Sequence, residues 1–237
     1  LDEVECEAEE DGDNIRLSGT KCFVQDLTMA NWVVVSATMK GTTRLMVLDM
    51  STVPADNYSR EVVIDETRRS YRLNLDGLVV PKENLLQGSD FQSLESAALL
   101  MLCAEISGGL MGVLPVIVEY LNTRKAFDRL IGSYQALKHP TVDILMSLEG
   151  ARSHLYHAST LFSQGKYPEF QSAIRMAKAQ GSEAFAFAGD RAVQFHGGFG
   201  FTYECDAQLF LRRALWCQYQ FGDERYHRQW LAGALFD

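Results

Sequence analysis

"LESAALLMLCAEISGGLMGVLPVIVEYLNTRKAF", residues 94–127, is the stretch that decides the fold. Its apolar run is too long for a strand and fits a buried helix, in which Gly108, Gly109 and Gly112 would let a neighbouring helix approach closely. Glu105 and the glycines interrupt the run before it reaches the ~20 apolar residues of a membrane span, so we expect no span. The stretch therefore predicts a central helix of a bundle.

Helical spacing continues from this stretch to the end of the sequence. A second helix is expected to begin at Gln135, and its apolar stripe is expected to contain Leu145, Leu148, Leu155 and Phe162. Further helices are expected over residues 170–195, 206–219 and 224–235. Residues 91–237 therefore predict an up-down helical bundle of the four-helix type.

Upstream of the apolar stretch, short β-branched runs alternate with turn residues. Examples are "NWVVVSAT" at 31–38 and "TRLMVLDM" at 43–50, and Pro81 lies at the end of this region. Such runs predict antiparallel strands in a sheet or a partial β-barrel. The sequence thus predicts an α+β fold, with a partial β domain over 1–90 followed by the helical domain over 91–237.

Composition excludes several classes of function. The chain has 237 residues, of which 47% are hydrophobic, so it can fill a sizeable core. A net charge of -9 argues against binding to nucleic acid or to an anionic membrane. Five cysteines without a C-x-x-C pair argue against a disulfide framework and favour a cytoplasmic protein. His154 and His157 lie three apart but lack further ligands, so no metal site is predicted.

Two motifs have both a functional and a purely structural interpretation. "HGGFGF" at 196–201 follows a helix rather than a strand, which argues against a dinucleotide-binding βαβ turn. Its bare backbone could face an anion or a flat ligand, or could simply cap the preceding helix. Arg124 and Phe127 could hold a phosphate and a ring, or could belong to an ordinary helix end.

Taken in order, four segments of the sequence resemble the acyl-CoA dehydrogenases, a flavoenzyme family with a helical, a β and a second helical domain. The segments are "LSGTKCFVQDLTMANWVVVSA" (17–37), "LDGLVVPKENLLQG" (75–88), "EYLNTRKAFDRLIGSYQALKHPTVDILM" (119–146) and "AVQFHGGFGFTYECDAQLFLRRA" (192–214). The resemblance implies part of the middle β domain and the whole C-terminal helical domain, in either a fragment or a naturally reduced subunit. The sequence is most similar to a bacterial branch that includes heteromeric subunits acting on steroid or other bulky acyl-CoA thioesters.

The resemblance also implies FAD as the cofactor, part of which a neighbouring subunit binds in the family. In the helical domain the matching residues are Arg124, Phe127, Ile131, Tyr134, Gln135, Gln194, Gly197 and Gly198. In the β domain Phe23 and Gln25 match positions beside the flavin ring, and Gln25 replaces the usual hydroxyl residue.

The family removes a weakly acidic α-proton from a thioester, which needs a carboxylate base. Its two usual base positions correspond to Phe221 and Ala98, neither of which can accept a proton. Glu95, one helical turn before Ala98, is the weak candidate for a substitute, and Glu204 matches a glutamate that more often makes an ion pair. The identity of the catalytic base is therefore unknown from the sequence.

The predicted function is α,β-dehydrogenation of an acyl-CoA by an FAD-dependent subunit that relies on a partner for its base. One alternative is a self-sufficient homotetramer that uses Glu95, and another is a flavin-free scaffold or binding subunit. The resemblance further implies a homo- or heterotetramer, with an electron-transfer flavoprotein as a possible electron acceptor.

Overall fold

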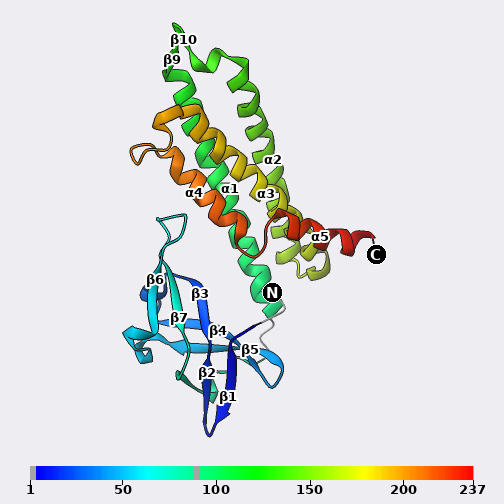
Figure 1. The fold of residues 1–237 in the computed structure, drawn as a ribbon. Coiled ribbons are helices and arrows are strands. Elements are labelled where there is room, and N and C mark those ends of the chain that lie inside the picture. The colour runs from blue at the N-terminus through cyan, green and yellow to red at the C-terminus, as the bar shows by residue number, and fades with distance from the viewer. Residues whose placement is uncertain (1–3, 88–90, 237) are drawn as a thin grey trace. The chain divides into compact units, whose positions relative to one another are not determined.

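The computed structural model describes residues 4–87 and 91–236. The chain divides into two compact units, Leu1–Leu94 and Glu95–Asp237, and each unit has a core of its own (Figure 1). The first unit consists of strands and short turns, whereas the second consists almost entirely of helices. The predicted order, a β unit followed by a helical unit, is confirmed.

Two sheets make up the β unit. The first has the order β5-β4-β1-β2-β8, built from β1 (Glu7–Asp11), β2 (Asn14–Ser18), β4 (Trp32–Met39), β5 (Thr42–Asp49) and β8 (Val79–Pro81). The second has the order β3-β7-β6, built from β3 (Thr20–Gln25), β6 (Tyr58–Glu61) and β7 (Ser70–Asn74). All these pairs are antiparallel except β1 with β4, which is parallel. Within the described residues, the sheets do not close into a barrel.

Alternating side chains hold the β unit together. In β2, Ile15 and Leu17 point into the core while their neighbours along the strand are exposed. Residues of the other sheet, such as Leu73 on β7, complete the same buried cluster. This period-two pattern is the physical reason that the short runs of the sequence form strands.

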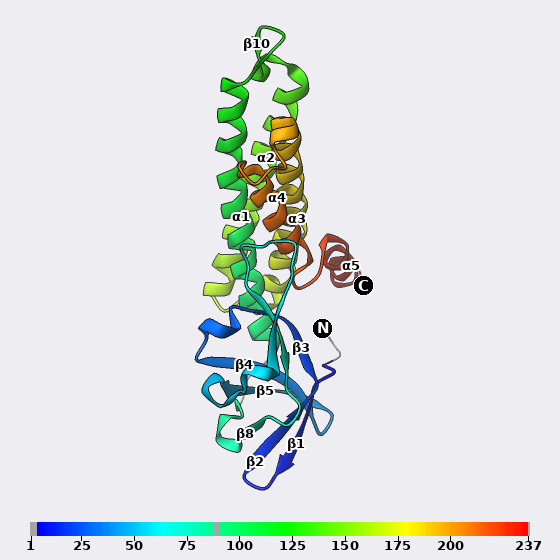
Figure 2. The ribbon, with the colours of Figure 1, turned by 60° about the vertical axis from the view of Figure 1, so that its left-hand side comes forward.

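The described residues of the helical unit form five α-helices. They are α1 (Phe91–Thr123), α2 (Gln135–Ser163), α3 (Tyr167–His196), α4 (Ala207–Tyr219) and α5 (Glu224–Phe236). The first four lie along one another as a bundle, and α5 turns away from them (Figures 1 and 2). A short hairpin, β9 (Lys125–Ala126) and β10 (Arg129–Leu130), joins α1 to α2.

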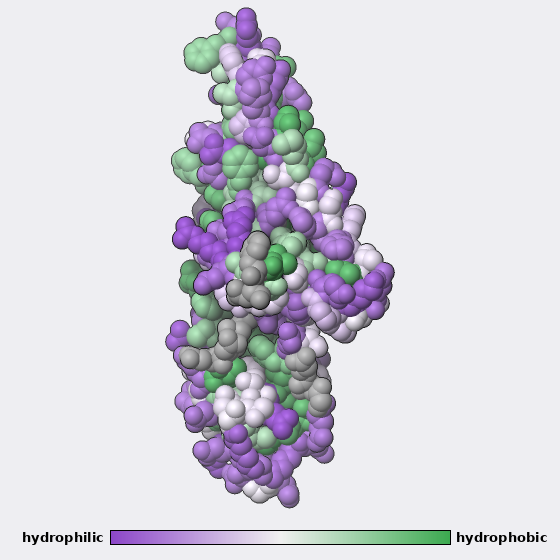
Figure 3. Space-filling model, turned by 90° about the vertical axis from the view of Figure 1, so that its right-hand side faces the viewer, coloured by the Kyte–Doolittle hydropathy of each residue, from purple (hydrophilic) through white to green (hydrophobic). Residues whose placement is uncertain are grey.

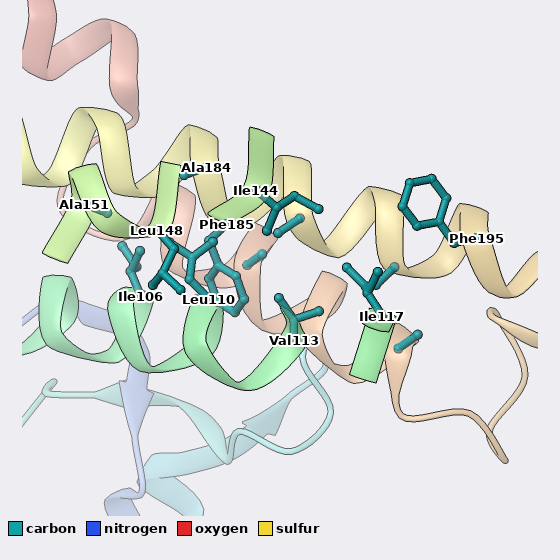
Figure 4. Packing of buried hydrophobic residues seen from close by; sticks show 14 of the residues in the cluster. Ile106, Leu110, Val113, Ile117, Ile144, Leu148, Ala151, Ala184, Phe185 and Phe195 are labelled. Carbon is teal, nitrogen blue, oxygen red and sulfur yellow. The ribbon is translucent and has the colours of Figure 1, made fainter. Parts of the chain in front are cut away.

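One face of α1 supplies the central row of the bundle core. Ile106, Leu110, Val113 and Ile117 recur every three or four residues and are at most 1% exposed. They face side chains of α2 and α3, among them Phe185 (Figure 4). Because each fully buried side chain of this size contributes about 1.5–3 kcal/mol, this row is a large part of what stabilises the unit.

The apolar stripe of α2 begins one residue earlier than the predicted one. Leu145, predicted to face the core, is 45% exposed. The buried residues of α2 are instead Ile144, Leu148, Ala151, Leu155 and Ala158. Their alternating spacings of four and three follow the 3.6-residue turn, whereas the predicted stripe combined spacings of three and seven and so drifted off the core at its start.

The helix α1 is continuous through the glycines and Glu105, as the predicted central helix requires. By length and composition alone it could cross a membrane, although the core helix of a soluble bundle passes the same test. Glu105 accepts a hydrogen bond from Arg213 of α4 at 2.6 Å, so its charge is paired within the bundle. On the face shown in Figure 3, hydrophilic residues are interspersed with hydrophobic ones.

Two adjacent glycines of α1 offer a test of this packing. A Cβ atom on Gly109 would lie 2.2 Å from the Phe185 ring, whereas one on Gly108 would meet no atom within 4 Å. We expect Gly109→Ala to lower the free energy of unfolding by about 1–3 kcal/mol, because the buried ring must move. Gly108→Ala should instead raise it by about 0.5–1 kcal/mol through its helix propensity. Denaturant unfolding checks both, and equal effects of the two variants would contradict the packing.

Candidate functional site

The β9–β10 hairpin presents an exposed aromatic ring at the end of the bundle. Arg129 pairs with Ala126, so that only Phe127 and Asp128 form the turn. Both have positive φ, 53° and 60°, which is uncommon for residues other than glycine and asparagine. The Phe127 side chain is 90% exposed. A bulky residue held in this conformation with its ring in solvent points to a ligand or partner contact.

The rest of this segment divides into structural residues and exposed ones. Ile131 is buried in the bundle core, and the Tyr134 hydroxyl donates to the Ala126 carbonyl at 3.1 Å. These two of the predicted cofactor residues therefore brace the hairpin. Arg124 follows the last residue of α1, Gln135 is the first residue of α2, and both side chains are exposed.

The glycine turn after α3 leaves its backbone open. Gly197 has φ 62°, a conformation that favours glycine, and a Cβ atom at Gly197 or at Gly198 would meet no atom within 4 Å. Gln194, in the last turn of α3, is exposed. The backbone N–H groups of this turn can therefore approach a ligand closely.

The hairpin segment and the glycine turn meet at the same end of the bundle. Tyr120 of α1 stacks on His196 of α3, with ring centroids 4.0 Å apart and an interplanar angle of 25°. The Tyr120 hydroxyl also donates to the His196 carbonyl at 3.4 Å. Since Tyr120 lies one turn before Arg124 and His196 directly precedes Gly197, this contact brings two distant segments of the sequence together.

The exposed groups at this end fit the FAD that the resemblance implies. Arg124 is a cation suited to a pyrophosphate, and the open backbone at Gly197 and Gly198 supplies further anion-binding N–H groups. Gln135 and Gln194 offer amides to a nucleotide. Phe127 offers a flat apolar surface for a ring.

In the β unit, Phe23 and Gln25 occupy an irregular part of β3. The register of β3 with β7 shifts between Lys21 and Val24, and Phe23 has φ 57° with a 60% exposed ring. The Phe23 N–H donates to Glu61 Oε2 at 2.8 Å. This bulge holds the ring outward, as a ring-stacking role requires.

The Gln25 side chain makes a hydrogen bond within the β unit. Its Nε2 donates to the Phe23 carbonyl at 3.3 Å, and its Oε1 is buried with no hydrogen-bond partner among the described residues. A carbonyl can only accept, which fixes this orientation of the amide. Gln25 therefore braces Phe23.

Phe221 lies in the turn between α4 and α5 with φ 56°, and its side chain is 38% exposed. Two acids follow, Asp223 in the turn and Glu224 as the first residue of α5, and both have structural roles. Asp223 Oδ1 accepts from the Tyr226 N–H at 2.9 Å and so caps α5, while Glu224 Oε2 accepts from Gln218 Nε2 at 3.0 Å.

The substitute candidate Glu95 is engaged as well. Its carboxylate lies 3.9 Å from the Arg175 guanidinium, and its side chain is only 12% exposed. Arg175 is itself buried, lies over the Trp230 ring at 4.3 Å, and is 3.4 Å from His227 Nδ1. Near Ala98, the side chains of α1, α3 and α5 thus form one buried polar cluster rather than a free base.

This region also holds two buried titratable residues that were not predicted from the sequence, Lys178 on α3 and His227 on α5. Burial lowers the pKa of Lys178 to about 8. Burial, with the nearby positive charges of Lys178 and Arg175, lowers the pKa of His227 to about 4. Sequence periodicity places Lys178 on the buried face of α3, which was the available signal, but the two backbone carbonyls that it binds lie 40 and 44 residues away.

Comparison with known proteins gives the following similarities. The family model for the acyl-CoA dehydrogenase C-terminal domain matches residues 97–236, more than half of the chain. Acyl-CoA dehydrogenase IpdE2 of Mycolicibacterium smegmatis is 35% identical over 136 residues, which cover 57% of this chain and 41% of that protein. Acyl-CoA dehydrogenase FadE12 of Mycobacterium tuberculosis is 28% identical over 209 residues, covering 83% and 54%. The chain therefore spans about half the length of these relatives.

The fold has a close counterpart among solved structures. The ChsE4-ChsE5 complex from Mycobacterium tuberculosis matches with a TM-score of 0.90 and 22% identity, covering 98% of this chain and 63% of that chain. At this identity the likeness concerns the fold alone.

The buried His227 predicts an acid-sensitive fold. Its folded pKa of about 4 lies below the ordinary histidine pKa of 6.5, so between these values the unfolded chain binds a proton that the folded chain excludes. We expect the free energy of unfolding to fall as the pH drops from 6.5 to 4, with a contribution from His227 of roughly 2–3 kcal/mol. His227→Gln should remove that contribution in denaturant titrations across this range, whereas the control His157→Gln, on an exposed part of α2, should not. An unchanged slope in His227→Gln would contradict the assignment.

Proposed function

The chain belongs to the acyl-CoA dehydrogenase family, and from this premise we propose that it is a subunit of an FAD-dependent enzyme that forms the α,β double bond of an acyl-CoA thioester. The observation that carries the proposal is the contact of Tyr120 with His196, because it assembles Arg124 and the Gly197 turn into one end of the bundle. The relatives IpdE2 and FadE12, each described as an acyl-CoA dehydrogenase, support the reaction class.

The cofactor roles follow from the exposed groups. Arg124 and the backbone at Gly197 and Gly198 would hold the pyrophosphate, with Gln135 and Gln194 on the nucleotide. Phe127 would pack on a ring at this end, and Phe23 of the β unit would lie against the flavin. FAD, when bound, supplies the acceptor for the hydride that leaves the β carbon.

The length of α1 supports the proposal that a site is shared between subunits. Arg124 directly follows this helix, and Ala98 lies near its other end. At 1.5 Å per residue, the 26 residues between them span about 39 Å. The cofactor end and the Ala98 end of one chain are therefore too far apart to face the same reacting atoms, and a neighbouring subunit would complete each site.

The proton acceptor is the second reason to propose a partner. Removal of the α-proton needs a positioned carboxylate, which Phe221 and Ala98 do not offer. Glu95 faces Arg175 in the interior, which argues against the self-sufficient enzyme. The proposed assembly is a tetramer in which another subunit type contributes the base and an electron-transfer flavoprotein is a possible acceptor.

The direct test is the visible absorption spectrum of the purified chain, with and without a candidate partner subunit, before and after anaerobic addition of acyl-CoA thioesters. The panel should include bulky polycyclic and straight-chain acyl groups. We expect a flavin band that bleaches only with the partner present. Bleaching with the chain alone would contradict the proposal that this chain lacks a catalytic base. The absence of a flavin band under both conditions would favour a flavin-free scaffold.

We expect the exposed Arg124 side chain to strengthen FAD binding. Arg124→Ala removes a charge-assisted contact to the pyrophosphate and should raise the FAD dissociation constant of the assembled protein by about 10–100-fold. Lys125→Ala, an equally exposed neighbour in β9, is the matched control and should change it by less than about threefold. Fluorescence titration of FAD measures both constants. A loss in both variants would indicate a general charge effect instead.

We expect a carboxylate introduced at position 221 to give the assembly flavin-bleaching activity. Phe221→Glu places a carboxylate at the family's base position, so acyl-CoA should bleach the flavin at a rate at least about 100-fold above that of the parent assembly without a base. The control Tyr219→Glu adds the same charge to an exposed residue two positions earlier and should not. If Phe221→Glu binds FAD and acyl-CoA but does not bleach, the turn is not the base position.

A further inference from the structure

A buried lysine holds the turn between α4 and α5 from inside the helical unit. Lys178, in the middle of α3, is 0% exposed. Its Nζ donates to the Gln218 carbonyl at 2.9 Å, to the Gly222 carbonyl at 2.8 Å and to the Ser182 hydroxyl at 3.0 Å. Three acceptors thus surround an ammonium group that has three N–H donors.

One of these bonds satisfies a backbone carbonyl that α4 leaves unpaired, and a second holds a carbonyl of the turn itself. Gln218 lies in the last turn of α4, where carbonyls have no partner within the helix. A cation at this end also interacts favourably with the helix dipole. Lys178 therefore contributes to the turn from another helix, 40 residues earlier in the sequence than Gln218.

The turn needs such support because its backbone is strained. Phe221 and the following Gly222 both have positive φ, 56° and 97°, and the former is costly for a bulky residue. A residue persists in this region only where its surroundings determine it. Here the surroundings are Lys178 on one side and the Asp223 cap of α5 on the other.

We propose that Lys178 is the positioning residue of this turn: it fixes the backbone of residues 218–222 so that the side chain of residue 221 leaves the helical unit. Identifying position 221 as the place of a base rests on the proposed function, whereas the hold on the backbone does not. Lys178 itself is fully buried and acts only through the backbone carbonyls that it binds.

The charged groups around Lys178 explain how an ammonium is retained there. The carboxylates of Glu224 and Asp223, at the start of α5, favour its charged form and oppose the effect of burial. The positive charge is in turn felt by His227, whose pKa it lowers. The site is therefore built from α3, α4, the turn between α4 and α5, and the start of α5.

The first experiment measures hydrogen exchange of the backbone amides in the assembled wild type and in three variants. Lys178→Met keeps the length of the side chain and removes the donors, so amides of residues 219–223 should exchange at least about tenfold faster, with those of the α1 core unchanged. Lys178→Arg restores donors and charge and should recover most of the protection. Ser182→Ala leaves both carbonyl bonds and should match the wild type. Unchanged exchange in Lys178→Met, or an equal increase in all helices, would overturn the proposal.

The second experiment tests whether the hydrogen bonds of Lys178 position the side chain of residue 221. In the Phe221→Glu background, Lys178→Met should slow flavin bleaching by at least about tenfold while the dissociation constant of acyl-CoA stays within about threefold. An equal bleaching rate would overturn the positioning role. If Phe221→Glu never bleaches, position 221 is not the place of a base, and hydrogen exchange alone still decides whether Lys178 fixes the turn.

Discussion

The contact of Phe185 with Gly109 sets the register on which the cofactor end of the bundle depends. The Phe185 ring of α3 occupies the space that a side chain at Gly109 of α1 would fill. The two helices can therefore neither slide nor rotate freely against each other. Both helices run in the same direction (Figures 1 and 2). Eleven residues further along each helix, about three turns, the same pairing places Tyr120 on His196. The meeting of the two ligand-facing segments is thus a consequence of core packing.

The helix α3 connects both regions of the helical unit for which we propose a function. Its C-terminal end leads into the glycine turn, and its middle carries Lys178, which binds the turn before α5. In the same helix Arg175 joins Glu95 of α1 to His227 of α5. One rigid element therefore determines the geometry at two separate places, and a disturbance of its core face would affect both.

The sequence predicts the arrangement of elements well and the side-chain partners poorly. The apolar run at 94–127 and the β-branched runs before Pro81 carry strong periodic signals, and the helix boundaries follow from them within a few residues. The pairing of Glu95 with Arg175 joins residues 80 positions apart, and no local pattern encodes it. Gln25 bonds locally, to the Phe23 carbonyl two residues away, but the bulge that directs its amide there arises from the pairing of β3 with β7. The site residues that were predicted came from motif resemblance, whereas Lys178 and His227 became visible only through tertiary contacts.

The continuous helix α1 has a consequence for how the amount of protein relates to its activity. In the proposed assembly, groups about 39 Å apart on one chain serve different reaction centres, so no centre exists on a free protomer. By mass action, the number of complete centres then rises more steeply than the total protein concentration wherever subunits are dissociated. Expression of one subunit without its counterpart would give folded protein with no working centre. Matched synthesis of the two chains would therefore matter as much to flux as the rate of any single centre.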